Sequence, residues 1–161
     1  MDGLTDSAEL RGYYGEIHPL ARQKVLDRLD HHCRAFIALS PLAVLATADP
    51  GGRVDASPRG DAPGFVLVVD DRTLLLPDRP GNNRVDSYGN VLASPGVGLL
   101  FLVPGLNETL RVNGRARVVT DRALLAPAVA QGKVPRAGDQ GDFTREPEHR
   151  RLLPSQYRPV R

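Results

Sequence analysis

Val97-Gly-Leu-Leu-Phe-Leu-Val103 and Thr109-Leu-Arg-Val-Asn-Gly-Arg-Ala-Arg-Val-Val119 are the two segments that decide the fold, because they predict paired strands. A short loop with Pro104 and Gly105 connects them. In the second segment, apolar or small residues alternate with arginines and an asparagine, so this strand is expected to have one buried and one solvated face. The short spacing between the strands argues against a doubly wound α/β sheet.

Four further strands are predicted upstream, each bounded by turn residues. An amphipathic helix is predicted at about 20–39, and a short helix at 121–130 with Asp121 as its N-cap. Together these elements predict a mainly β (α+β) fold, a small antiparallel barrel of six strands with an N-terminal helix and short flanking helices. The four upstream strands are expected at 42–48, 54–57, 65–69 and 73–76.

The composition is that of one globular domain, with 161 residues, 41% hydrophobic and 25% charged residues and a net charge of +2. The arginines are scattered among acidic residues and the chain has no Trp, so nucleic-acid binding is not expected. The single cysteine, Cys33, cannot form an internal disulfide, which favours the reducing cytoplasm. No apolar run approaches the roughly 20 residues of a membrane span. A metal site is not expected either, because the adjacent side chains of His31, His32 and Cys33 point in different directions on a helix.

Asp78-Arg79-Pro80-Gly81-Asn82-Asn83-Arg84 gives the strongest signal for a ligand. This segment follows the strand at 73–76 and precedes an amphipathic run at 85–92, so it is expected at a strand-to-helix junction. Backbone N–H groups at the start of a helix and the forked donors of arginine both bind phosphate. The chain has no G-x-G-x-x-G and no Walker A motif, so the common dinucleotide and triphosphate sites are not expected.

Polar clusters at 55–61 and 107–111 accompany this segment on the predicted strands. Neither contains the G-x-S-x-G sequence of a hydrolase nucleophile, and no catalytic residue can be assigned. Taken in order along the chain, the polar and apolar segments resemble the pyridoxamine 5′-phosphate oxidase-like FMN-binding split-barrel family, in particular its branch of predicted FMN-dependent oxidoreductases of unknown substrate. The segments that carry the resemblance are 43–47, 55–61, 74–84, 90–95, 97–105 and 109–116.

The resemblance implies a six-stranded split barrel that binds FMN without a covalent link at the interface of a homodimer. By position, Arg59 matches one basic residue that holds the FMN phosphate in that family, and a cluster after the central hairpin matches the rest of the phosphate site. Two residues of the 55–61 segment would flank the ribityl chain or the ring, and the 107–111 segment would reach the flavin from the partner subunit. The residues concerned are Arg79, Asn82 and Arg84 for the phosphate, Ser57 and Asp61 for the ribityl chain or ring, and Asn107, Glu108 and Arg111 for the partner's flavin.

The function implied is that of an FMN-dependent oxidoreductase acting on a small molecule, with NAD(P)H or another flavin as the electron source. A non-catalytic flavin- or haem-binding or storage protein is the alternative, as is an inactive family member altered at its C-terminus. Pyridoxamine phosphate oxidases themselves end in a basic substrate-binding segment with His that has no counterpart here, so oxidation of vitamin B6 is not expected.

The chain is expected to divide into an N-terminal extension (1–19), the FMN-binding split-barrel domain (20–135) and a tail (136–161). The tail has no strand or helix pattern, which predicts either disorder or a shifted reading frame. Codons for residues 137–144, read one base later, can encode Leu-Val-Ile-Lys-Val-Thr-Leu. Such an alternating segment would supply a closing strand for the barrel.

Overall fold

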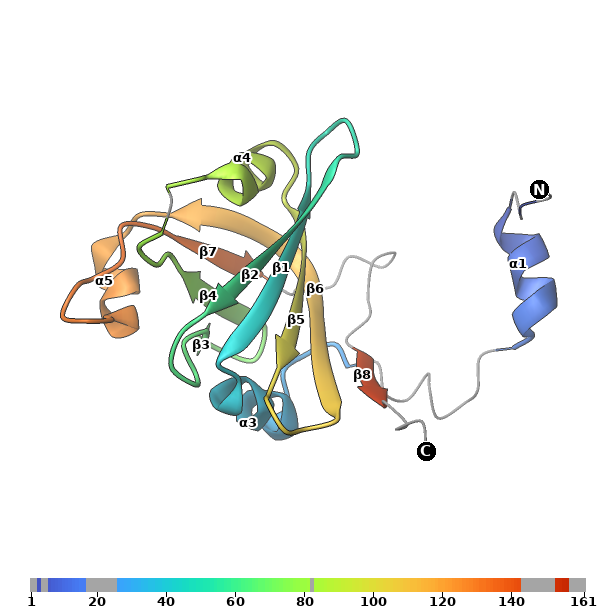
Figure 1. Ribbon diagram of the computed structural model, residues 1–161, viewed down its shortest axis with the longest axis horizontal. Coiled ribbons are helices and arrows are strands. Elements are labelled where there is room, and N and C mark those ends of the chain that lie inside the picture. Colours follow the sequence, from blue (N-terminus) through green and yellow to red (C-terminus); the bar gives the residue numbers. More distant parts are fainter. Residues whose placement is uncertain (1–2, 4–5, 17–25, 82, 143–152, 157–161) are drawn as a thin grey trace.

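A computed structural model describes residues 3, 6–16, 26–81, 83–142 and 153–156, and shows a curved antiparallel sheet with helices at its ends (Figure 1). The mainly β fold class predicted from the sequence is confirmed. The strands are β1 (Leu42–Ala48), β2 (Val54–Gly60), β3 (Leu67–Val68), β4 (Thr73–Pro77), β5 (Gly96–Leu102), β6 (Glu108–Val119), β7 (Gly138–Asp142) and β8 (Leu153–Gln156). The helices are α1 (Ser7–Tyr14), α3 (His31–Leu39), α4 (Asp86–Ala93), α5 (Arg122–Leu125) and the 3₁₀ helix η1 (Ala126–Ala128).

The strands follow the order β2-β1-β5-β6-β7-β4-β3, and β8 pairs with the start of β6. Every pairing is antiparallel. Within the described ranges no pairing joins β2 to β3, the two ends of this order. The barrel is therefore split between β2 on one side and the β3–β4 pair on the other.

All six predicted strands are present, but the predicted number is too low because β7 and β8 add to them. The prediction that residues 136–161 form an irregular tail is wrong for Gly138–Asp142. This segment is β7, which pairs with β4 on one side and β6 on the other. The sequence as given therefore supplies the closing strand, and no shifted reading frame is needed to close the barrel. Of the rest of the tail, the structure describes Arg136, Ala137 and β8, and residues 143–152 and 157–161 lie outside the described residues.

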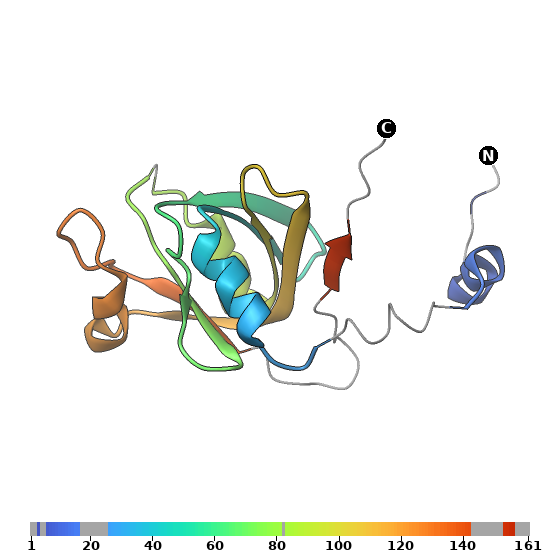
Figure 2. The same cartoon turned by 90° about the horizontal axis from the view of Figure 1, so that it is seen from below.

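The core is formed by the inward faces of the strands and by the apolar sides of the helices. Leu45, Phe101 and Val112 lie at its centre and are no more than 1% exposed. Helix α3 covers one end of the barrel and α4 lies toward the other end (Figures 1 and 2). Helix α4 is fastened to the sheet by the side-chain amide of Asn90, which donates to Thr47 Oγ1 at 3.0 Å. This fixes α4 beside the split.

The predicted helix at 20–39 begins later than expected. Residues 17–25 lie outside the described part of the chain, residues 26–30 are not helical, and α3 begins at His31. Asp30 caps it, accepting a hydrogen bond from the Cys33 N–H at 2.8 Å. The apolar periodicity extended the prediction because Leu29 is buried in the core although it lies outside the helix. The predicted cap at Asp121 is confirmed, since its carboxylate accepts from the N–H groups of Ala123 and Leu124.

Replacing Asp30 by Ala is expected to lower the free energy of unfolding by about 1 kcal/mol, the usual effect of losing an N-cap. The hydrogen bond from the Cys33 N–H also holds the pKa of Asp30 below its ordinary value. Urea unfolding at pH 7 would measure the loss. Asp27→Ala, which removes a nearby carboxylate that does not cap α3, should change the stability by less than half as much. Equal losses in the two variants would contradict the capping role.

Helix α1 lies in the segment predicted as an N-terminal extension, and none of its residues is buried. Asp6 caps it by accepting from the Glu9 N–H at 2.7 Å. The division of the chain at residue 19 stays a prediction. None of the helices in the described ranges has the length and apolar character needed to cross a membrane.

Candidate functional site

Two adjoining cavities open at the split of the barrel. The larger, of about 760 Å³, lies between the end of β2, the loop after β4 and the segment that follows η1. The smaller, of about 580 Å³, runs along β2 toward the start of α4. Arg59, Arg79 and Arg84 line both. These volumes are in the range of small-molecule and cofactor sites.

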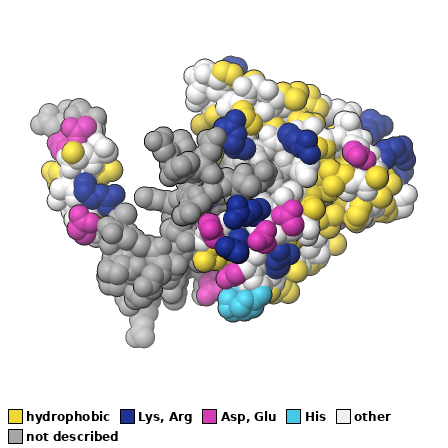
Figure 3. All heavy atoms as spheres, turned by 180° about the vertical axis from the view of Figure 1, so that it is seen from behind, with side chains coloured by type: hydrophobic (Ala, Val, Ile, Leu, Met, Phe, Trp, Pro, Cys, Tyr) yellow, Lys and Arg dark blue, Asp and Glu magenta, His cyan; other side chains and the backbone are white. Residues whose placement is uncertain are grey.

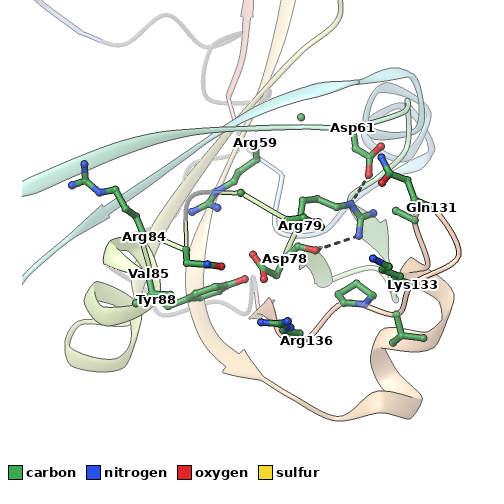
Figure 4. A pocket seen from close by; sticks show the side chains of 17 residues that line it. Arg59, Asp61, Asp78, Arg79, Arg84, Val85, Tyr88, Gln131, Lys133 and Arg136 are labelled. Atoms are coloured by element: carbon green, nitrogen blue, oxygen red, sulfur yellow. Dashed lines mark hydrogen bonds and ion pairs between the residues drawn. The ribbon is translucent and has the colours of Figure 1, made fainter.

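The larger cavity is strongly cationic. Five cationic side chains and two carboxylates line it, and Figure 4 shows them arriving from both walls. Such an excess of positive charge in a partly enclosed space attracts an anionic ligand. The cations are Arg59, Arg79, Arg84, Lys133 and Arg136, and the carboxylates are Asp61 and Asp78.

Arg59 is the best-placed donor. Its Nη2 donates to Ser87 Oγ at 3.0 Å, and Ser87 in turn donates to Asp55 Oδ2 at 2.8 Å, so strand β2 and helix α4 jointly hold the guanidinium. Its Nε is buried and has no acceptor among the described residues. A buried N–H without an acceptor is costly, so Arg59 Nε is expected to have an acceptor that is not among the described residues, such as a water molecule or a ligand.

Arg79, predicted to lie at the phosphate site, lines both cavities and also contacts two neighbouring segments. Its Nε forms an ion pair with Asp61, and its Nη1 donates to the Ala128 carbonyl at 2.9 Å. The hydrogen bond from the Ala62 N–H, followed by the contact with Arg79, holds the pKa of Asp61 below its ordinary value. Arg79 therefore ties the loop after β4 to the end of β2 and to η1, with two of its donor atoms already used.

Arg84 stands at the mouth of the cavities, with its side chain 74% exposed and paired with Asp86 at 2.7 Å. The preceding residue, Asn83, has φ of 57°, in the left-handed region. The segment 78–84 lies between β4 and α4, which confirms the predicted strand-to-helix junction; α4 begins at Asp86, and residues 83–85 are not helical. Asn82 itself lies outside the described residues.

The remaining predicted residues divide into two groups. Ser57 and Asp61 line the smaller and the larger cavity respectively. Asn107, Glu108 and Arg111 lie in the loop before β6 and at its start, and do not line either cavity of this chain. The prediction that these three reach the flavin of a partner subunit is untested.

The sequence did not predict that the segment after η1, residues 130–136, lines the larger cavity. Gln131 and Gly132, with φ of 50° and 72°, make a tight turn closed by the bridge between Ala130 and Lys133. This turn places Lys133 at the cavity, and Arg136 follows just before β7. Neither side chain has an ion pair or hydrogen bond with another described residue. The only signal in the sequence was that Lys133 is one of two lysines in the chain.

Tyr88, on the first turns of α4, was also missed. Its ring enters the larger cavity with the hydroxyl toward Asp78 (Figure 4). Burial, and then the nearby carboxylates Asp139 and Asp78, raise the pKa of this phenol above its ordinary value. Tyr88 therefore stays a neutral hydrogen-bonding group throughout the physiological range.

These residues fit a phosphate-bearing cofactor such as FMN. The half-buried Arg59, the exposed Arg84, and Lys133 and Arg136, which have no ion pair with another described residue, form the kind of donor set that binds phosphate. Among the residues that the structure describes, no group of three or more His, Cys, Asp or Glu side chains could hold a metal ion. On the face opposite that of Figure 1, basic and acidic side chains are interspersed rather than gathered into a basic patch (Figure 3).

Comparison with known proteins agrees with this picture. Residues 29–153 match the family model described as pyridoxamine 5′-phosphate oxidase. The HupZ protein of Group A Streptococcus has a TM-score of 0.55 and 23% identity, over 70% of this chain and 87% of that one. A putative pyridoxamine 5′-phosphate oxidase from Lactobacillus delbrueckii has a TM-score of 0.57 and 20% identity, over 73% of this chain and 91% of that one.

An FMN-binding protein from Syntrophomonas wolfei has a TM-score of 0.58 and 14% identity, over 94% of this chain and 98% of that one. No curated protein matches the chain. At these identities the solved structures show the fold alone, whereas the family match extends over the barrel from before β1 to the start of β8. The chain therefore belongs to the pyridoxamine 5′-phosphate oxidase family.

Proposed function

We propose that this protein is a cytoplasmic, homodimeric FMN-binding flavoprotein and an oxidoreductase that acts on a small molecule. The observation that carries the proposal is the position of Arg59. Its guanidinium is held by Ser87 at a cationic cavity, and its buried Nε has no acceptor in the part of the chain that the structure describes. The family match and the fold shared with an FMN-binding protein support it.

In this proposal Arg59 and Arg84 hold the FMN phosphate, and Arg79 with Asp61 keeps the loop after β4 in place around it. Ser57 contributes a polar contact along β2. When bound, the flavin supplies the chemistry of hydride and electron transfer, so the protein needs only to bind it, orient it and exclude water. Lys133 and Arg136 are assigned to an acidic group of the substrate, or of NAD(P)H if that is the electron donor.

The test begins with the small molecule that accompanies the purified protein. A yellow protein from which FMN is released by denaturation and identified by mass would support flavin binding. Anaerobic addition of NADH or NADPH should then bleach the flavin absorbance if the protein is an oxidoreductase using these donors. Bound FMN that neither donor reduces would favour a flavin-storage role. A purified protein that neither contains nor takes up FMN would refute the proposal.

Replacing Arg84 by Ala is expected to weaken FMN binding by about 2 kcal/mol, or about 30-fold, because a charge-assisted contact to phosphate is lost. Quenching of FMN fluorescence on titration would measure the dissociation constant. Arg122→Ala, which removes an exposed arginine on α5 away from both cavities, serves as the control. Equal dissociation constants for Arg84→Ala and the control would remove Arg84 from the phosphate site.

A further inference from the structure

Asp139 is a carboxyl group on the interior side of the closing strand. It lies in register between Leu76 of β4 and Val118 of β6, which both pack in the main core, and it is only 5% exposed. Its Oδ1 accepts no hydrogen bond from any described residue. An ionised carboxylate in such a place is costly unless a cation compensates it.

The charged and titratable groups that interact electrostatically with Asp139 come from three elements. Arg59 extends from β2, Asp78 follows β4, and Tyr88 comes from α4. Its register neighbours on β4 and β6 are apolar. Burial, and then the like charge of Asp78, outweigh the attraction of Arg59 and raise the pKa of Asp139 to about 7. Among the described residues, Arg59 is therefore the cation that favours the ionised form of Asp139.

Arg59 also has a buried polar atom without a hydrogen-bond partner among the described residues. Its Nε is a buried donor without an acceptor among the described residues, and Oδ1 of Asp139 is likewise a buried acceptor without a donor among them. The same guanidinium lines both cavities. Arg59 therefore interacts electrostatically with Asp139 in the core and also lines the cavities in which an anion would bind.

We propose that Asp139 is a proton-linked counterion of Arg59, ionised while the cavity is empty and protonated when a phosphate dianion binds against Arg59. A bound dianion offsets the positive charge that favours ionised Asp139 and adds a like charge nearby, and both effects favour the neutral acid. Binding then takes one proton from solvent onto a carboxylate oxygen of Asp139, with no other bond made or broken. The inference rests on the proposed function for the identity of the natural ligand, FMN, but not for the linkage itself.

The linkage predicts a specific dependence of FMN affinity on pH. The complex binds more protons than the free protein, so affinity should fall by about 10-fold between pH 7 and pH 8.5, where free Asp139 is ionised. Asp139→Asn keeps the size of the side chain and mimics the protonated acid. Its affinity should be constant over this range, and any titration of the FMN phosphate itself is common to both proteins.

The experiment is a pH-stat titration of the full-length protein at pH 8 with FMN and, in parallel, with inorganic sulfate, which does not titrate in this range. We expect uptake of about 0.5–1 proton for each FMN bound by the wild type and less than a quarter of that by Asp139→Asn. Equal uptake in the two proteins would overturn the linkage. Sulfate binding with proton uptake, in a protein that does not bind FMN, would refute the proposed function and support the linkage.

Failure of both anions to bind in the pH-stat titration would overturn the linkage as well.

Carbon-13 NMR of the side-chain carboxyls gives a second test that needs no variant. The titration midpoint of the Asp139 carboxyl in the wild type should rise by at least one pH unit when FMN is added. A midpoint that is unchanged by FMN that does bind would contradict the proposal.

Discussion

Replacing Arg59 by Gln is expected to weaken FMN binding by at least about 3 kcal/mol, or more than 100-fold. The loss should exceed that for Arg84, because the Arg59 guanidinium is partly buried and held by Ser87 and α4, whereas the side chain of Arg84 is 74% exposed. A preorganised, desolvated charge contributes more to binding than one that must be drawn out of water. Titration of FMN fluorescence would measure the affinity.

Arg53→Gln is the matched control for this variant. Arg53 lies in the β1–β2 turn, is 91% exposed and pairs with Asp49 rather than lining a cavity. Its replacement should leave the dissociation constant within about twofold of the wild type, as is usual for a surface ion pair. A dissociation constant for Arg59→Gln within threefold of the wild type would remove Arg59 from the phosphate site.

Replacing Asp139 by Asn is expected to stabilise the free protein at pH 8 by about 2–4 kcal/mol. The pKa of Asp139 is about 7 in the folded protein, above its ordinary value of 3.8. Between these values the unfolded chain releases a proton that the folded protein keeps, so stability falls as pH rises from about 4 to 7 and stays low above pH 7. The Asn side chain does not ionise, so the variant lacks this loss.

Urea unfolding of the FMN-free protein at pH 4.5, 6, 7 and 8 would measure the effect. The gain for Asp139→Asn should be largest at pH 8 and small at pH 4.5. Asp71→Asn, a half-buried aspartate in the β3–β4 turn, should follow the wild-type dependence on pH. A gain of the same size at pH 4.5 and pH 8 would show that ionisation of Asp139 is not its cause.

Local sequence patterns were sufficient to predict most strands of the barrel. The alternation in β6, the turn residues between β1 and β2, and the cap at Asp121 each depend on a few neighbouring residues. Strand β7 could not be predicted in this way, because Gly138-Asp-Gln-Gly-Asp142 contains residues that are rare in strands. It forms because both of its neighbours, which are distant in sequence, offer backbone partners.

In the candidate site, too, some residues could be predicted from the local sequence and others depend on contacts between distant segments. The sequence pointed to Arg59 and to the 78–84 loop, and both line the cavities. It could not show that Arg79 is engaged by Asp61 and Ala128, since Ala128 lies in a different segment. Lys133, Arg136 and Asp139 also escaped notice, because only the β6–β7 connection brings them to the split.

The position of β7 in the sheet also has a consequence for biosynthesis. Strand β4 contains Leu74, Leu75 and Leu76, each no more than 3% exposed in the folded protein. It has only the short β3 beside it until Gly138–Asp142 is available, since Leu75 pairs with Gln140. We therefore expect a chain still attached to the ribosome to present three leucines to solvent until residues 138–142 have been synthesised. A chaperone that binds apolar segments would protect the chain during this interval.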